Sequence, residues 1–73
     1  MKPKMRFWMG STPDKCDNCG QEIGAQFVDG KTVMGPWGML CVACHKTIGV
    51  GLGLGKGQLY EYQKSGDWLK IKG

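Results

Sequence analysis

The side chains with the clearest chemistry in this 73-residue chain are its four cysteines, which stand in two C-x-x-C pairs. The full spacing, C-x₂-C-x₂₁-C-x₂-C, is close to that of zinc-binding modules, with a slightly longer spacer between the pairs. Four thiolates complete a tetrahedral shell and leave no open position for a substrate, so such a site is structural rather than catalytic. We therefore predict one structural Zn²⁺ bound by Cys16, Cys19, Cys41 and Cys44.

Other chemistries fit the same cysteines less well. Disulfides are typical of oxidising compartments. Four cysteines also suit iron, but the second pair lacks the Pro and Gly that accompany rubredoxin-like knuckles. Residues 41–45 match the C-x-x-C-H haem attachment motif, an assignment that leaves Cys16 and Cys19 unexplained. His45 is an alternative ligand, although the symmetry of the pairs favours a place beside the site, with a hydrogen bond nearby.

The sequence gives no indication of catalysis. It contains no paired carboxylates, no nucleophile–base pair and no open metal position. Residues 51–57 resemble a Walker A loop, but only three residues separate the first glycine, Gly51, from Gly55-Lys56, where the motif has four. Gly57 also stands where the motif has a Ser or Thr whose hydroxyl binds magnesium. We therefore expect a protein that is not an enzyme and has no small-molecule substrate. Contact of Lys56 and nearby backbone N–H groups with phosphate stays open.

The local patterns around the first cysteine pair predict a knuckle followed by a hairpin. A chain this short rarely folds on its apolar core alone, so the metal has to act as a staple. Residues 16–20 form the knuckle. Residues 23–28 and 31–34 are predicted strands, joined at Asp29-Gly30, which is a strong hairpin signal.

The second cysteine pair is predicted to lie on a short helix. Cys41, Cys44, His45 and Ile48 follow the i, i+3, i+4, i+7 spacing of one helix face, and Gly49 is a natural C-cap. Knuckle, hairpin and helix in this order predict a small metal-stapled α+β fold of the treble-clef type. The alternative is a zinc ribbon, which has two knuckles and no helix.

We expect a basic N-terminal arm over residues 1–13 and a single zinc-binding domain over residues 14–73. In chain order the parts of this domain are a zinc module (14–49), a Gly-rich connector (50–57) and a C-terminal β-hairpin (58–72). Alternation in the hairpin places Tyr60 and Tyr62 on the face that carries Trp68 and the lysines. Among the other aromatic residues, we expect Trp37 and Trp68 in the core and Phe7 or Trp8 docked on the domain.

The formal net charge is +4, and four thiolates around Zn²⁺ carry −2, so the metal-bound protein is close to +2. The positive charge lies in the two flanks of the chain, beside aromatic residues that could stack on bases. These features favour a nucleic-acid-binding or transcription-linked accessory protein. The candidate partner-binding residues are Lys2, Lys4, Arg6, Trp8, Lys56, Tyr60, Tyr62, Lys64, Trp68, Lys70 and Lys72.

The run from Cys16 to about Tyr62 resembles a group of small bacteriophage-encoded zinc-finger proteins. The shared features are both C-x-x-C pairs, residues 27–32, Gly-Pro-Trp at 35–37, and residues 51–53 through 57–60. The resemblance covers about two thirds of the chain. It implies a viral origin, expression in a bacterial cytoplasm and a structural metal, but no activity. Only the four cysteines carry over as site residues.

The alternative function is a protein-interaction module that binds and modulates a bacterial host protein. It is suggested by the modest charge, the single arginine and the apolar residues Phe7, Trp8, Val50, Leu52 and Leu54. No stretch approaches the length of a transmembrane helix, and only three consecutive apolar residues follow the basic start, which is too few for a secretory signal. We therefore expect a cytoplasmic protein with no membrane partner.

Overall fold

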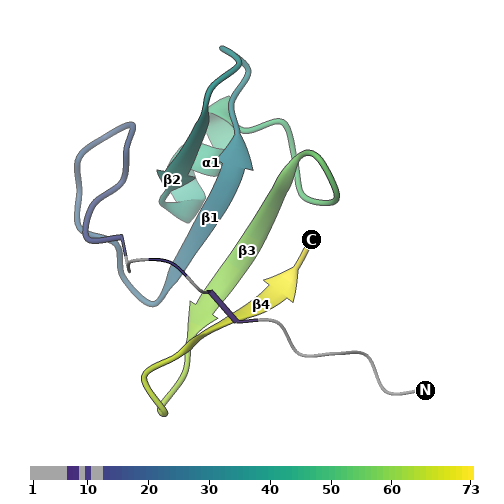
Figure 1. The fold of residues 1–73 in the computed structure, drawn as a ribbon. Helices are drawn as coiled ribbons and strands as arrows, with labels where there is room; N and C mark the ends of the chain where they lie inside the picture. The colour runs from purple at the N-terminus through teal and green to yellow at the C-terminus, as the bar shows by residue number, and fades with distance from the viewer. Residues whose placement is uncertain (1–6, 9, 11–12) are drawn as a thin grey trace.

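A computed structural model describes residues 7, 8, 10 and 13–73 of the chain. The predicted partner-binding residues Lys2, Lys4 and Arg6, and most of the predicted arm, lie outside this part. The elements are β1 (Gln26–Lys31), β2 (Trp37–Leu40), α1 (Val42–Ile48), β3 (Gly57–Tyr62) and β4 (Trp68–Lys72). The strands form one antiparallel sheet in the order β2-β1-β3-β4 (Figure 1).

The small α+β fold predicted from the sequence is confirmed. Helix α1 begins directly after Cys41 and ends before Gly49, as its spacing predicted. Strands β3 and β4 form the predicted C-terminal hairpin. The hairpin is not a separate unit, because β3 pairs along β1 from Gln26↔Glu61 to Gly30↔Gly57 and so joins both hairpins into one sheet.

The predicted turn at Asp29-Gly30 is wrong. Both residues lie inside β1, and the chain turns over residues 32–36 instead. There the Thr32 backbone N and Oγ1 both donate to the Pro36 carbonyl, at 3.0 and 2.8 Å, and Gly35 takes a φ of 108°. Because only glycine adopts that φ easily, Gly35 decides where the hairpin closes.

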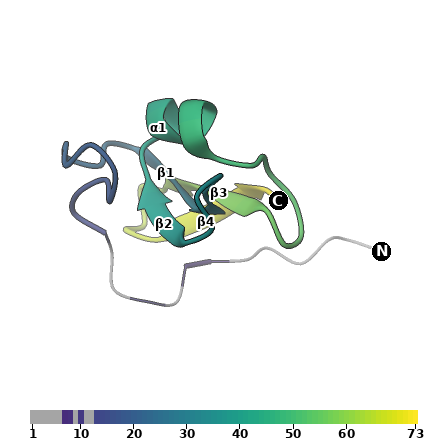
Figure 2. The same cartoon turned by 90° about the horizontal axis from the view of Figure 1, so that it is seen from above.

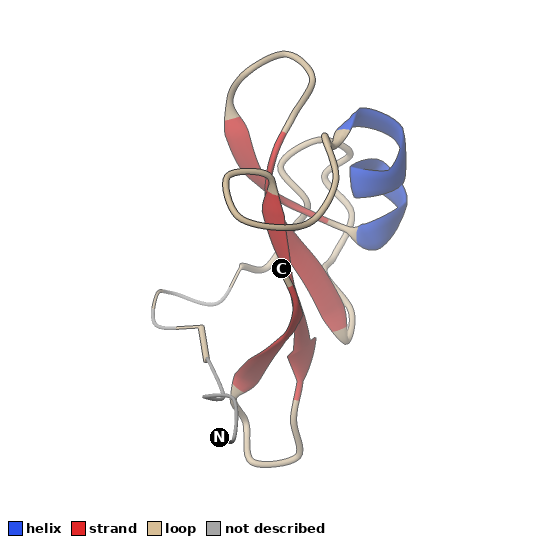
Figure 3. Cartoon of the chain, turned by 90° about the vertical axis from the view of Figure 1, so that its right-hand side faces the viewer, coloured by secondary structure: helices blue, strands red, loops and turns tan. Residues whose placement is uncertain are grey.

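Gly30 is a packing position rather than a turn. A Cβ at Gly30 would lie 3.3 Å from His45 Cδ2 and 3.2 Å from Val28 Cγ1. In the register, Gly30 pairs with Gly38 of β2 and with Gly57 of β3. This row of three glycines removes side chains where α1 and the loop after it approach the sheet (Figures 2 and 3).

The face of the sheet opposite α1 carries an aromatic core. Phe27 is fully buried, and its ring centroid lies 5.2 Å from that of Tyr60 and 4.9 Å from that of Trp68. Trp8 lies across Phe27 and Tyr60, each at 5.4 Å, and its backbone N donates to the Trp68 carbonyl (2.9 Å). Trp8 therefore docks on the domain as expected. Trp68 is buried as expected.

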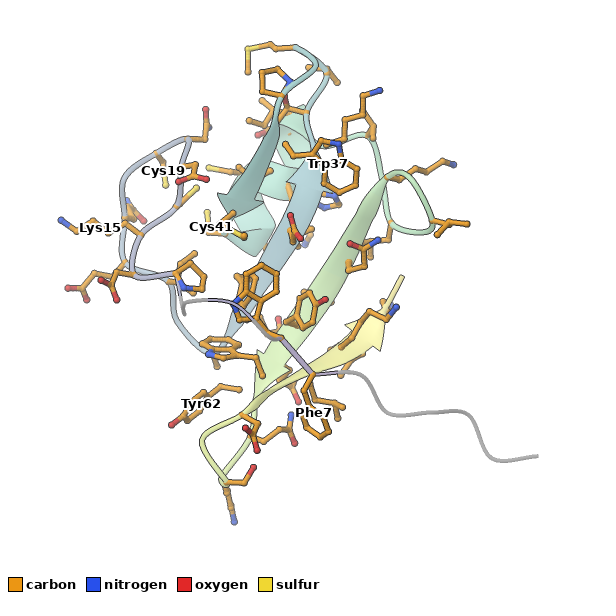
Figure 4. All side chains as sticks on the ribbon, viewed as in Figure 1. Phe7, Lys15, Cys19, Trp37, Cys41 and Tyr62 are labelled. Atoms are coloured by element: carbon orange, nitrogen blue, oxygen red, sulfur yellow. The ribbon has the colours of Figure 1, made fainter. Side chains whose placement is uncertain are left out.

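Trp37, by contrast, is not a core residue. Its side chain is 47% exposed, because it begins the short edge strand β2 directly after the turn. The segment that carries Trp8 packs over the middle of the sheet. Figure 4 shows Trp37 at the end of the sheet far from Phe7 and Tyr62.

Candidate metal centre

The first cysteine pair lies in a tight turn between two short backbone pairings. Cys16 N donates to the Gln21 carbonyl (2.8 Å), and Gly20 N donates to the Cys16 carbonyl (2.9 Å). Gly20 has a φ of 76°, which permits the sharp turn directly after Cys19. These bonds hold the two sulfurs on the same side of the loop.

The second pair is positioned by the start of α1. Cys41 is the N-cap residue, and its Sγ lies 3.5 Å from Cys44 N in the first turn. Cys41 follows Leu40, the last residue of β2, so the edge of the sheet leads directly into the second cysteine pair. Figure 4 shows Cys19 and Cys41 turned toward each other from the knuckle and from this junction.

The four sulfurs form a compact cluster that could hold one metal ion such as zinc. All four Sγ atoms lie within 4.8 Å of one another, and Cys19 Sγ is 3.9 Å from Cys41 Sγ. An ion about 2.3 Å from each of four tetrahedral sulfurs places them roughly 3.8 Å apart. The separations are far longer than the ~2.05 Å of a disulfide bond, and all four cysteines are free. The geometry therefore fits a metal and not a pair of disulfides.

The cluster is also electrostatically suited to a cation. Burial raises the pKa of Cys16, but the backbone N–H groups of Cys19, Cys41 and Asn18 outweigh this effect and lower it to about 6. The Asn18 amide lowers the pKa of Cys44, yet the neighbouring Cys41 thiol, burial and the other two thiols raise it to about 12. Four adjacent sulfurs do not all ionise without a positive charge between them, and a bound cation supplies that charge.

The two residues inside the knuckle support the site and were not predicted from the sequence. Asn18 donates its backbone N to Cys16 Sγ (3.4 Å) and its side-chain Nδ2 to Cys44 Sγ (3.3 Å). Asp17 makes two hydrogen bonds with Met39 on β2. Their residue types could have indicated this role, because Asn and Asp side chains commonly form hydrogen bonds with nearby backbone groups in turns.

An apolar shell surrounds the cluster on the α1 side. Leu40 is 1% exposed and packs with Cys16 and Cys44, and Ile23 and Ile48 close the same cluster. This shell excludes water from the inner sulfurs.

His45 does not belong to the cluster. Its Nε2 lies 2.9 Å from the Gly51 carbonyl, and the ring packs over Gly30. The imidazole therefore ties α1 to the glycine-rich loop, in agreement with the expectation of a hydrogen bond beside the site.

The predicted partner-binding residues are not all brought together. Trp8, Tyr60 and Trp68 pack on the same aromatic core, and buried Trp68 has little surface to offer. Tyr62 is 52% exposed and contacts Trp68 edge-on. The lysines are spread over the fold: Lys56 precedes β3, Lys64 follows it, and Lys70 and Lys72 lie on β4.

The structure adds Lys31 as a candidate partner-binding residue, and it exposes Trp37, for which the sequence favoured the core over a base-stacking role. They are cross-strand neighbours at the end of the β1–β2 pairing. Lys31 N also donates to the Lys56 carbonyl (2.8 Å), which brings Lys56 alongside. A sequence signal existed for Trp37, because it follows the Gly35-Pro36 turn.

Comparison with protein-family models, with curated proteins and with solved structures finds no match to this chain. Within the described residues, no helix has both the length and the apolar character needed to span a bilayer.

Proposed function

We propose that this protein is a zinc-stabilised, non-enzymatic module that binds nucleic acid and acts as an accessory factor, for example in transcription. The supporting observation is the half of the open sheet face that Trp8 leaves uncovered. Exposed Trp37 lies there with Lys31, and the Lys56 backbone lies alongside Lys31. Lys70 lies farther away, on the edge strand β4 opposite Tyr60. Lysine side chains beside an exposed aromatic ring are the usual components of a phosphate- and base-binding surface.

In this proposal the metal centre holds the fold and takes no part in chemistry. Knuckle, hairpin and a helix that carries the second ligand pair follow one another as in a treble clef, and α1 argues against a plain zinc ribbon. The proposed ion is one structural Zn²⁺. A bacteriophage origin and action in the cytoplasm of a bacterial host belong to the same proposal and rest on the resemblance of the sequence motifs.

Fluorescence anisotropy of labelled DNA and RNA, titrated with metal-loaded protein, tests the proposal. Affinity is expected to fall steeply as salt rises, because each phosphate contact releases counterions. The double variant Lys31→Gln/Lys70→Gln should bind several times more weakly. Its matched control, Lys15→Gln/Lys46→Gln, removes the same charge from the residue before the knuckle and from α1. Absence of binding at about 50 mM salt, where electrostatic association is strong, would contradict the proposal.

A second candidate function is a module that binds a bacterial host protein. It is favoured by an apolar cleft of about 200 Å³ beside the metal centre, between the knuckle, the 32–36 turn and α1. Met34 and Trp37 on its rim are 69% and 47% exposed. A pull-down from bacterial lysate with and without nuclease separates the two functions. A protein partner that persists after nuclease supports the second, and one that is lost supports the first.

A further inference from the structure

The uncovered half of the sheet face has an ordered arrangement of side chains. Alternation along β1 places Asp29 and Lys31 on the same face as Phe27, away from α1. Across the sheet, Lys31 pairs with Trp37, and Asp29 pairs with Met39 on one side and Gln58 on the other. The pair Trp37 and Lys31 therefore lies two residues along β1 from the pair Asp29 and Gln58, on the same face of the sheet.

Trp37 differs from the other two tryptophans in lying outside the aromatic core and in being more exposed. Trp8 and Trp68 both pack against Phe27. Among the described residues, Trp37 takes part in none of the aromatic pairs, and nearly half of its surface is exposed. A flat exposed ring can stack on a nucleobase only where the face of that base is open, as it is in a single strand and is not inside a duplex.

Asp29 has the character of a ligand-binding carboxylate. It is half-buried, yet no hydrogen bond or ion pair joins its side chain to another residue in the described part of the chain. Burial raises the pKa of this carboxyl. Opposite it, Gln58 directs its Nε2 toward the Gly53 carbonyl (3.4 Å), which leaves the amide oxygen as the free polar atom. A carboxylate and an amide on cross-strand neighbours offer acceptors that suit a donor group such as the exocyclic amino group of cytosine.

We propose that this face binds single-stranded nucleic acid, with one base stacked on Trp37 and its amino group donated to Asp29. The lysines at the margin, Lys31 and Lys70, hold the adjoining phosphates. The carboxylate at the centre repels phosphate and attracts an amino group, so the charges orient the strand with its bases inward. This inference rests on the proposed nucleic-acid function and gives it a strand type, a base preference and a site.

The test measures anisotropy with four labelled probes: a dC 12-mer, a dT 12-mer, an rC 12-mer and a 12-base-pair duplex. Metal-loaded wild-type protein is expected to bind the dC probe about tenfold more tightly than the duplex, and more tightly than dT. The rC probe shows whether a 2′-hydroxyl is accepted. Trp37→Ala should lose about tenfold on the single strands and little on the duplex, and Asp29→Asn should remove the preference of dC over dT.

Phe7→Ala is the matched control, because Phe7 is also an exposed aromatic residue but lies at the other end of the sheet (Figure 4). Metal content and circular dichroism check that each variant folds, and Trp37→Phe retains a stacking ring should Trp37→Ala fail. If single-strand affinity is unchanged in Trp37→Ala, or falls equally on duplex and single strands, the site is wrong while nucleic-acid binding stands. If wild-type protein binds none of the probes, the proposed function is wrong as well, which favours the protein partner.

Discussion

Asp17 and Met39 are joined by two hydrogen bonds, one in each direction. Asp17 N donates to the Met39 carbonyl (2.9 Å), and Met39 N donates to Asp17 Oδ2 (2.8 Å). Met39 is on the edge strand β2. Asp17 therefore satisfies the outward backbone N–H and C=O groups of Met39, as a neighbouring strand would. Because Asp17 stands between Cys16 and Cys19, this pairing fixes the first cysteine pair relative to the second, which follows β2.

The first prediction concerns Asp17→Ala. The loss of one carboxylate hydrogen bond is expected to lower stability by about 1 kcal/mol. Since supporting residues of metal sites commonly change affinity about 10- to 100-fold, metal affinity should fall by roughly tenfold. Chelator competition and thermal melts measure the two effects. Asp17→Asn retains an acceptor oxygen and should lose less, and Asp14→Ala serves as the control. Equal metal affinity in Asp17→Ala and Asp14→Ala would count against this role.

The second prediction is that metal and fold are lost together. A chain of 73 residues has a small core, whereas structural zinc contributes on the order of 10–16 kcal/mol in small peptides. Elemental analysis should find one Zn²⁺ per chain, and a chelator should abolish the native circular dichroism and NMR spectra. Reductant without chelator is the control, and it should leave both spectra unchanged. A native spectrum after complete removal of the metal would show that the core is sufficient alone.

The parts of this fold that follow local rules were predictable from the sequence. The spacing of the cysteines predicted a cluster that the structure places within 4.8 Å. The helix followed from the positions of Cys41, Cys44 and Ile48, and the last hairpin from alternation around Ser65-Gly66. The helix and hairpin signals are each contained in fewer than about a dozen neighbouring residues, and the cysteine signal is the ligand spacing itself, so none of them depends on an unseen distant contact.

The first hairpin could not be placed in this way, because two local signals compete. Asp29-Gly30 and Gly35-Pro36 both favour a turn. The feature that disfavours a turn at Gly30 is distant in sequence, because His45, on a helix that follows later in the chain, packs over Gly30. The pairing of β1 with β3 joins distant parts of the chain, so no local pattern predicts it. The same holds for the packing of Trp8 on Phe27 and for the exposure of Trp37.

The third prediction concerns the close approach of Gly49 to His45. A Cβ at Gly49 would lie 2.5 Å from the His45 carbonyl oxygen and would collide with the imidazole ring. Gly49→Ala should therefore destabilise the protein by about 1–3 kcal/mol, the usual range for overpacking. Gly24→Ala is the control, because its added Cβ meets nothing within 4 Å. Urea denaturation of the metal-bound variants gives both values, and equal stability would mean that the loop relaxes freely.

The fourth prediction is that Trp8 contributes more to stability than its neighbour Phe7. Trp8 makes edge-on contacts with Phe27 and Tyr60, while Phe7 is 41% exposed. Trp8→Ala should cost about 2 kcal/mol, less than the ~3–5 kcal/mol of a fully buried aromatic residue. Phe7→Ala should stay within about 0.5 kcal/mol of wild type, as exposed substitutions usually do. Urea denaturation midpoints of the two variants compare these losses of stability. Similar losses would show that Trp8 contributes no more to stability than Phe7 does.

The last prediction concerns the effect of pH on stability through Asp29. Burial raises the pKa of its carboxyl in the folded protein, so the folded state binds this proton more tightly than the unfolded state does. The contribution of Asp29 to stability is therefore most favourable below the unfolded pKa of about 3.9. It is lost as pH rises through the higher folded pKa. At neutral pH the ionised carboxylate opposes folding.

Asp29→Asn removes this ionisation and should melt at a higher temperature than wild type at pH 7. The difference should shrink as pH falls toward about 5, before the metal ligands are protonated. Asp14→Asn, at an exposed carboxyl just before the knuckle, is the control, and it should show no comparable gain. If Asp29→Asn is more stable at pH 7 and also loses the preference for cytosine, then this carboxylate opposes the fold and serves binding, as groups at functional sites often do. A variant that is less stable at every pH would show instead that the carboxylate has a structural partner.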